Sequence, residues 1–321
     1  MECLVKPAPA GLLVLALAVL AAPAYAELRV FVASGLGGEA EYEQRFQHQA
    51  EAIAKAAERS GAAAGNVVLL SGERARRESL QHELAAFVGK AQKEDQVVVV
   101  FIGHGSFDGD DYRFNVPGPD VTGRELAAML DKIPSRQQLV VNATSSSGAV
   151  AETWKRPGRI VITATKSGGE RNATKFAQFW VEALTSSEAD RDKNDTVTAQ
   201  EAYDYAARRV ADTFKADAAL ATEHSRMEGG SDAGRFIVAR LGNTAVLPND
   251  AALAAMLKEQ AGVEQQIDEI KSRKASLSAD PYYDELEKAL ITLAKLDRRI
   301  DDRKAALMGT PARESNGTKR R

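Results

Sequence analysis

The sequence predicts an α/β fold in which helices cover both faces of a parallel β-sheet, followed by a C-terminal α-helical hairpin. Between residues 28 and 184, short apolar runs alternate with longer segments of helical pattern. Such alternation is typical of a parallel sheet with crossover helices. After residue 250, apolar residues recur mostly at steps of three, four and seven among Ala, Glu, Lys and Leu, which is the pattern of paired helices in a coiled coil.

The elements of the predicted sheet can be placed one by one. Strands are expected at 28–33, 67–70, 96–102, 138–142 and 159–164, and helices at 41–60, 74–92, 122–130 and 173–184. The almost unbroken apolar run at 97–101 is typical of a parallel strand buried on both faces. Right-handed crossovers bring the carboxyl ends of such strands to one edge, so the loops there are the expected place of a site.

The last part of the chain predicts an antiparallel helical hairpin over residues 250–308. Between its two helices, Asp280 is expected as the cap and Pro281 as the first residue of the second helix. The hairpin, if it exposes an apolar stripe, would suit a helical partner. The polar and basic residues 309–321 are expected to be disordered. The α/β domain is then expected over residues 27–247.

Residues 1–26 have the pattern of a secretory signal peptide. Lys6 precedes an apolar run at 11–22 that is too short to span a bilayer, and Ala24 and Ala26 supply the small residues of a cleavage site. An uncleaved membrane anchor is the alternative. The prediction is a periplasmic or secreted protein that begins at Glu27 and has no transmembrane segment in its mature form.

Charge and cysteine content exclude two classes of function. The formal net charge is −3 at pH 7, so no basic excess indicates binding to nucleic acid. The single cysteine, Cys3, lies in the segment expected to be removed. The mature protein is therefore expected to form no disulfide and to use no thiol chemistry.

Two loops at the expected sheet edge carry groups suited to catalysis. His104 follows the most apolar strand and stands between Gly103 and Gly105, and a hydroxyl-rich run at 144–147 follows the next strand. A base and a nucleophile are commonly arranged in this way. The sequence thus predicts a site that contains His104, Gly105 and the hydroxyl of Thr144 or Ser145.

These motifs resemble those of the legumain-like (peptidase family C13) and caspase-like cysteine peptidases. In these families a buried strand ends in His-Gly, and the next ends in an acid-Ala-Cys triplet with Ser-Gly just after it. His104-Gly105 is similar to the first motif and residues 142–148 resemble the second. Counting forward from Ala143 puts Thr144 at the cysteine position, whereas counting back from Ser147-Gly148 puts Ser145 there.

The resemblance covers residues 28–240 and implies a caspase/legumain-like parallel-sheet sandwich. Residues 161–171 resemble the strand and loop that help to form the substrate pocket, which implies pocket roles for Thr165 and Glu170. Residues 46–50 resemble an early Tyr-Arg-His-Gln-Ala stretch. There, Gln47 takes the place of an arginine that would contact an acidic or amide side chain of the substrate.

The missing cysteine decides which function the resemblance implies. A hydroxyl needs a well-placed base to remove its proton during attack, whereas a thiol is intrinsically very nucleophilic. The favoured hypothesis is a pseudoenzyme that binds a peptide or protein ligand without cleaving it. A Ser/Thr-dependent hydrolase with His104 as base is the second hypothesis, and a structural partner protein acting through residues 250–308 is the third.

A separate motif predicts a calcium site at residues 190–201. Its expected ligands stand at positions 1, 3, 5, 7, 9 and 12 of an EF-hand-like loop and are Asp190, Asp192, Asn194, Thr196, Thr198 and Glu201. Asp195 stands where glycine is usual, which favours weak binding near about 10⁻⁴ M. The helices flanking the loop are expected at 175–184 and 199–210. A solvated acidic loop with Thr198 as a helix cap is the alternative.

Overall fold

The computed structural model describes residues 26–241, 250–274 and 278–307. Most of the expected signal peptide, residues 1–25, and the expected disordered tail, residues 309–321, lie outside the described residues. The contacts divide the chain into two compact units. One comprises Met1–Glu58 and Ala62–Ala239, and the other comprises Arg59–Gly61 and Arg240–Arg321.

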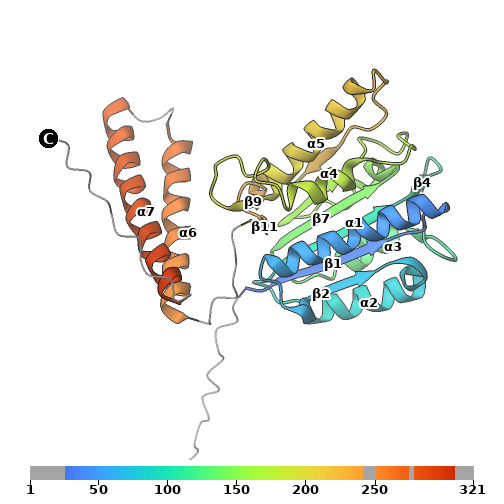
Figure 1. Ribbon diagram of the computed structural model, residues 1–321, viewed down its shortest axis with the longest axis horizontal. Helices are drawn as coiled ribbons and strands as arrows, with labels where there is room; N and C mark the ends of the chain where they lie inside the picture. Colours follow the sequence, from blue (N-terminus) through green and yellow to red (C-terminus); the bar gives the residue numbers. More distant parts are fainter. Residues whose placement is uncertain (1–25, 242–249, 275–277, 308–321) are drawn as a thin grey trace, which may run out of the picture. The chain divides into compact units, whose positions relative to one another are not determined.

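The first unit is built on a six-stranded sheet with the strand order β10-β8-β7-β3-β1-β2. Its strands are β1 Leu28–Ser34, β2 Val67–Leu70, β3 Gln96–Gly103, β7 Gln137–Thr144, β8 Arg159–Thr163 and β10 Arg226–Glu228. All pairings are parallel except that of the edge strand β10, which runs antiparallel to β8. The predicted α/β class with a parallel sheet is therefore confirmed (Figure 1).

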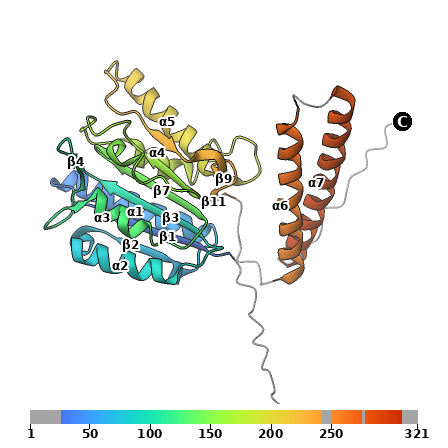
Figure 2. The same ribbon diagram turned by 180° about the vertical axis from the view of Figure 1, so that it is seen from behind.

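Helices cover both faces of this sheet (Figures 1 and 2). They are α1 Ala40–Arg59, α2 Arg77–Lys90, α3 Gly123–Leu130, α4 Phe176–Ala183 and α5 Ala199–Ala216. The helix expected at 74–92 begins later, at Arg77, because the chain first makes a 3₁₀ turn over Gly72–Ala75. α3 and α5 begin where the reciprocal Thr122–Glu125 and Thr198–Glu201 hydrogen bonds satisfy free backbone N–H groups.

Two small sheets are added to the main one, and the sequence did not predict either. One joins β4 Gly105–Phe107, β5 Tyr112–Phe114 and β6 Val121–Thr122, and the other joins β9 Thr196–Thr198 with β11 Ile237–Arg240. Strands of two to four residues are too short to show an alternating pattern. The first small sheet extends directly from the loop that contains His104.

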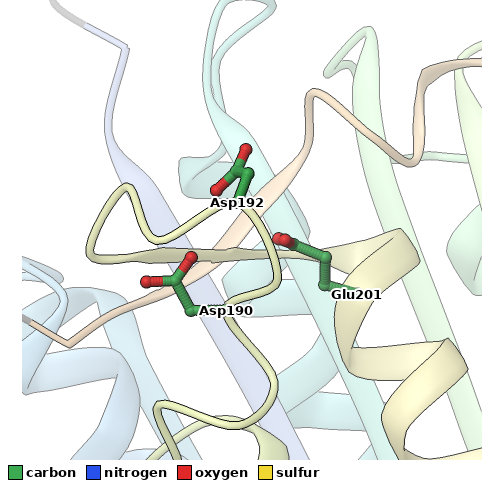
Figure 3. A group of neighbouring side chains, drawn as sticks. All are labelled: Asp190, Asp192 and Glu201. Carbon is green, nitrogen blue, oxygen red and sulfur yellow. The ribbon is translucent and has the colours of Figure 1, made fainter.

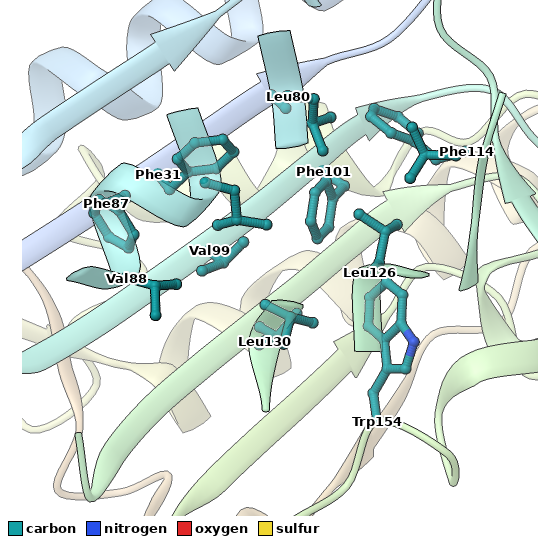
Figure 4. Packing of buried hydrophobic residues seen from close by; sticks show 14 of the residues in the cluster. Phe31, Leu80, Phe87, Val88, Val99, Phe101, Phe114, Leu126, Leu130 and Trp154 are labelled. Carbon is teal, nitrogen blue, oxygen red and sulfur yellow. The ribbon is translucent and has the colours of Figure 1, made fainter. Parts of the chain in front are cut away.

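The hydrophobic core on one face of the sheet joins β1, β3 and β7 to α2 and α3 (Figure 4). Phe101 packs edge-on against Phe114 and Trp154, with ring centroids 5.4 and 5.8 Å apart. The indole nitrogen of the fully buried Trp154 donates a hydrogen bond of 3.0 Å to the Gly123 carbonyl. This bond removes the cost of burying a polar group and fixes the start of α3.

The second unit contains the helices α6 Ala251–Ser272 and α7 Ala279–Leu307. They share an apolar seam that includes Leu253, Val263, Ile267, Leu296 and Ile300. Asp250, just before α6, pairs with Arg303 near the end of α7, and Arg273 pairs with Glu285 near the start of α7, so the helices run antiparallel. α7 begins at Ala279, two residues before the expected Pro281, which therefore lies in the first turn, where no backbone donor is needed.

No helix in the described ranges is long and apolar enough to cross a membrane.

Candidate functional site

The carboxyl ends of β3 and β7 bring the two predicted loops together. These strands are parallel neighbours whose last paired residues are Gly103 and Thr144, so His104 and Ser145 are the next residue on each strand. The loops approach so closely that a Cβ at Gly105 would lie 2.5 Å from the Ser145 carbonyl oxygen and 2.8 Å from Oγ1 of Thr144. Glycine is therefore required at position 105.

The His104 ring is held by aromatic side chains of α1. Its centroid lies 5.0 Å from that of Tyr42 and 5.2 Å from that of Phe46, both in edge-to-face contact. Burial lowers the pKa of His104, and the Arg45 cation adds to this effect, while a hydrogen bond to the Gly37 backbone opposes it. A lowered pKa leaves the imidazole neutral at neutral pH and able to accept a proton.

The Thr144 hydroxyl is fully engaged by neighbours other than His104. Its Oγ1 lies 2.6 Å from the Tyr112 hydroxyl and donates a hydrogen bond of 2.8 Å to Oδ1 of Asn142. Burial raises the pKa of Tyr112 to about 12, so the phenol keeps its proton. Tyr112 belongs to the core face lined by α2 and α3, whereas His104 packs against α1. The Thr144 side chain is therefore directed to the other face of the sheet.

Ser145 has the opposite arrangement, because its hydroxyl makes no hydrogen bond to any residue that the structure describes. Its side chain is 1% exposed, and Oγ has no hydrogen-bond partner. The same holds for Ser146, whose backbone is in the left-handed region at φ 57°. A base must lie within hydrogen-bond reach of the nucleophile it activates. Here the hydroxyl of Ser145, the residue that follows β7 as His104 follows β3, is buried and makes no hydrogen bond to the imidazole.

Thr165 and Glu170, the expected pocket residues after β8, bind the neighbouring loops together. Thr165 Oγ1 accepts a hydrogen bond of 2.8 Å from the Gly148 backbone, and the Glu170 carbonyl accepts one of 2.8 Å from the Ser146 backbone. The Glu170 carboxylate contacts His224 Nδ1 at 2.5 Å. Burial alone would raise the pKa of Glu170, but hydrogen bonds from the Lys166 backbone and from His224 outweigh it and lower the pKa.

Gln47, the third expected pocket residue, forms its hydrogen bond within its own helix. It is exposed on α1, and its amide donates a hydrogen bond of 3.1 Å to Glu51. Arg45 is the cation that acts on His104 instead. Residues two apart on an α-helix are separated by about 200° around its axis, so Arg45 and Gln47 lie on nearly opposite sides of α1. The pocket role of Gln47 stays a prediction.

Arg45 lacks a charged partner within the described part of the chain. Its guanidinium lies 4.5 Å from the centroid of the Tyr42 ring, and its Nε is buried without a hydrogen-bond acceptor. None of the described ion pairs includes it. Nearby, Leu36 is 42% exposed in the loop after β1, one residue before the Gly37 that bonds to His104. Arg45 is therefore a cation that acts on the His104 ring, and Leu36 is an exposed apolar residue in the adjoining loop.

The loop expected to bind calcium gathers three of its six predicted ligands. Carboxylate oxygens of Asp190, Asp192 and Glu201 all lie within 4.8 Å of one another (Figure 3). Burial raises the pKa of Asp192, and the charges of Glu201 and Asp190 raise it further. Asp195, at the position where glycine is usual, takes the left-handed conformation at φ 61°. The loop thus has the turn that an EF-hand-like loop requires without the glycine.

The other three predicted ligands have hydrogen-bonding roles. Asn194 Oδ1 accepts bonds of 2.8 and 2.6 Å from the backbone and hydroxyl of Thr196, and the Thr198 hydroxyl caps α5. The flanking helices lie where they were expected, since α4 spans Phe176–Ala183 and α5 begins at Ala199.

Glu223 is a buried carboxylate that the sequence did not reveal as important. It accepts hydrogen bonds of 2.7 and 2.9 Å from the backbone of Lys175 and Phe176, at the start of α4. Burial raises the pKa of Glu223 to about 7, although these two bonds act in the other direction. No local pattern could have identified it, because its partners stand almost fifty residues earlier in the chain.

Comparisons with known proteins extend only to the fold. No protein-family model matches the sequence, and no curated protein matches it. Among solved structures, the chain is similar to caspase-1 from Spodoptera frugiperda, with 12% identity, a TM-score of 0.45, and coverage of 63% of this chain and 86% of that chain. A similarity at this level carries no argument about the site or its activity.

Proposed function

We propose that the protein binds a peptide or protein segment at the edge formed by the ends of β1, β3 and β7, and does not cleave it. The observation that carries this proposal is the buried Ser145 hydroxyl, which has no hydrogen-bond partner among the described residues and is not bonded to His104. Thr144, the other candidate nucleophile, is engaged by Tyr112 and Asn142. The proposed setting is the periplasm or the outside of the cell, as the expected signal peptide indicates.

The chemistry around His104 favours a ligand with a carboxylate next to an apolar side chain. Arg45 has guanidinium donors and no ion-pair partner in the described part of the chain, so it can receive a carboxylate in a bidentate manner. The exposed Leu36 offers an apolar contact beside it.

Binding of paired peptides tests this proposal. Fluorescence anisotropy would compare a library of peptides containing Asp or Glu with the same peptides carrying Asn or Gln. We expect acidic peptides to bind more tightly, and Arg45→Gln to remove the preference. Gln47→Ala is the matched control on the opposite side of α1 and should leave it intact. Equal binding of acidic and amide peptides to the parent protein would overturn the proposal.

Mass spectrometry of the same peptides distinguishes binding from hydrolysis. The proposal expects every peptide to be recovered intact. Cleavage that disappears in both His104→Gln and Ser145→Ala would instead establish the alternative, a Ser-dependent hydrolase with His104 as base.

We further propose that the loop at residues 190–201 binds Ca²⁺ and stabilises the α/β unit. The clustered carboxylates of Asp190, Asp192 and Glu201 support this proposal, because hard cations prefer oxygen ligands. β9 lies within this loop and pairs with β11, so an ion there would also secure the second small sheet.

A further inference from the structure

The outward face and one flank of α7 expose apolar side chains that the hairpin does not cover. Leu286, Ala289, Leu293, Leu296 and Ile300 pack toward α6. Away from this seam, Tyr283 is 58% exposed, and Leu290 and Ile291 are each 46% exposed. At about 100° per residue, Ile291 lies opposite the residues that face α6, whereas Tyr283 and Leu290 lie on one flank of α7, about 80–100° from Ile291. These three make up most of the large, strongly exposed apolar residues in the described chain. Clustered apolar residues on a surface mark an interaction site.

Charged residues are arranged symmetrically about this apolar centre. Five exposed residues at steps of three and four form a stripe, here called the outer seam: Asp284, Glu287, Ile291, Lys295 and Arg298. At about 100° per residue, all five lie within about 40° of the direction of Ile291. The two acids lie seven and four residues before Ile291, and the two bases lie four and seven residues after it.

The charges of the outer seam are unpaired within the described residues of the hairpin. Charged side chains nearer α6 do have partners, since Glu285 pairs with Arg273, Arg299 with Glu259, and Arg303 with Asp250. None of the described ion pairs includes a residue of the outer seam. The seam therefore offers an acidic half and a basic half to another molecule.

We infer that the outer seam binds the outer seam of a second copy of this chain, with the two α7 helices antiparallel. A twofold axis at Ile291 would place Asp284 opposite Arg298 of the second copy and Glu287 opposite its Lys295. It would also bring the two Ile291 side chains together. A parallel arrangement would oppose acid to acid. Equal spacing of opposite charges about one residue is what a self-complementary twofold interface requires.

This inference is independent of the proposed ligand site. It rests on exposed charges and apolar residues of α7 alone. An unrelated helix would need no such symmetry, which is why the second copy is the favoured occupant.

Sedimentation of the exported chain tests the inference through two charge-reversed variants. One carries Asp284→Arg with Glu287→Lys, and the other carries Lys295→Glu with Arg298→Asp. We expect the parent protein at twice the chain mass and each variant at the single mass. An equimolar mixture of the two variants should return to twice the mass, because their seams are complementary. Leu220→Asp is the control, since Leu220 is the most exposed apolar residue of the α/β unit.

Three outcomes would overturn the inference. The parent protein could sediment at the single mass at every concentration, which would leave the seam to another occupant. Both variants could keep twice the mass, which would place the interface elsewhere. The mixture could also stay at the single mass although circular dichroism shows that each variant retains its helices.

Cross-linking checks the position of the axis. In a Cys3→Ser background, Ile291→Cys should form a disulfide between copies on oxidation. Asp302→Cys should not, because antiparallel packing about Ile291 separates the two Asp302 positions by about 33 Å along the helices. Efficient cross-linking at Asp302 and none at Ile291 would exclude the proposed register.

Discussion

The backbone nitrogen of Glu27 lies 3.1 Å from Oδ1 of Asp95, a carboxylate that is 1% exposed. The other oxygen of Asp95 accepts a hydrogen bond of 2.6 Å from Nε of Arg29. Cleavage after Ala26 would turn this backbone N–H into a positively charged amino group. The predicted cleavage point therefore coincides with a buried anion.

We predict that a chain beginning at Glu27 is more stable than one that retains Ala26. A charged hydrogen bond is stronger than a neutral one, so the expected gain in the free energy of unfolding is about 1–2 kcal/mol. Urea denaturation of the two chains measures it. Asp95→Asn should abolish the difference, and a difference that survives in Asp95→Asn would refute the assigned role of Asp95.

We predict opposite effects for the two neighbouring hydroxyls at the end of β7. Thr144→Val leaves Tyr112 with only its longer contact to Asn142, at 3.4 Å, and should cost about 1–3 kcal/mol of stability. Ser145→Ala removes a buried hydroxyl that bonds to nothing, so the protein should be equally stable or more stable. Chemical denaturation of both variants provides the comparison. A larger loss in Ser145→Ala would mean that its hydroxyl has a partner.

We predict that Glu223 makes the α/β unit less stable above neutral pH. Its pKa in the folded protein is about 7, above the ordinary value of 4.5. The stabilisation gained from binding this proton is complete below the unfolded-state pKa and is lost as the pH rises through about 7. A shift of this size corresponds to about 3 kcal/mol.

Glu223→Gln isolates this effect, because glutamine stays uncharged. Thermal melts between about pH 5 and pH 8 should show the parent losing stability relative to the variant as the pH rises. A constant difference between the two proteins across this interval would contradict the raised pKa.

We predict that millimolar Ca²⁺ raises the melting temperature relative to chelator. If the dissociation constant is about 10⁻⁴ M, a free Ca²⁺ concentration a hundred times higher would add about 2.7 kcal/mol to the free energy of unfolding. Asp190→Asn with Glu201→Gln should remove the effect, and glutamine at 201 can still complete the cap of α5. Mg²⁺ at the same concentration should stabilise less. An unchanged melting temperature in the parent protein would eliminate the calcium site.

The sequence predicted the sheet because long runs such as that of β3 have a strong pattern, and it predicted a helix at 122–130, whose Thr122–Glu125 cap only the structure shows. It could not choose between Thr144 and Ser145, because the choice depends on Tyr112, which lies 32 residues away from Thr144 in the chain. It also could not reveal that Arg45 is a cation near His104. Which side of a helix faces a site depends on tertiary packing rather than on local pattern.

The outer strands of the main sheet are short, with three residues in β10 and four in β2. A long, flat outer strand presents a row of free backbone donors and acceptors that can recruit a strand from another molecule and begin aggregation. Here each outer strand offers only a few such groups. The α/β unit is therefore a poor template for fibril growth, a property that would suit the proposed export of a chain without disulfide bonds to stabilise it.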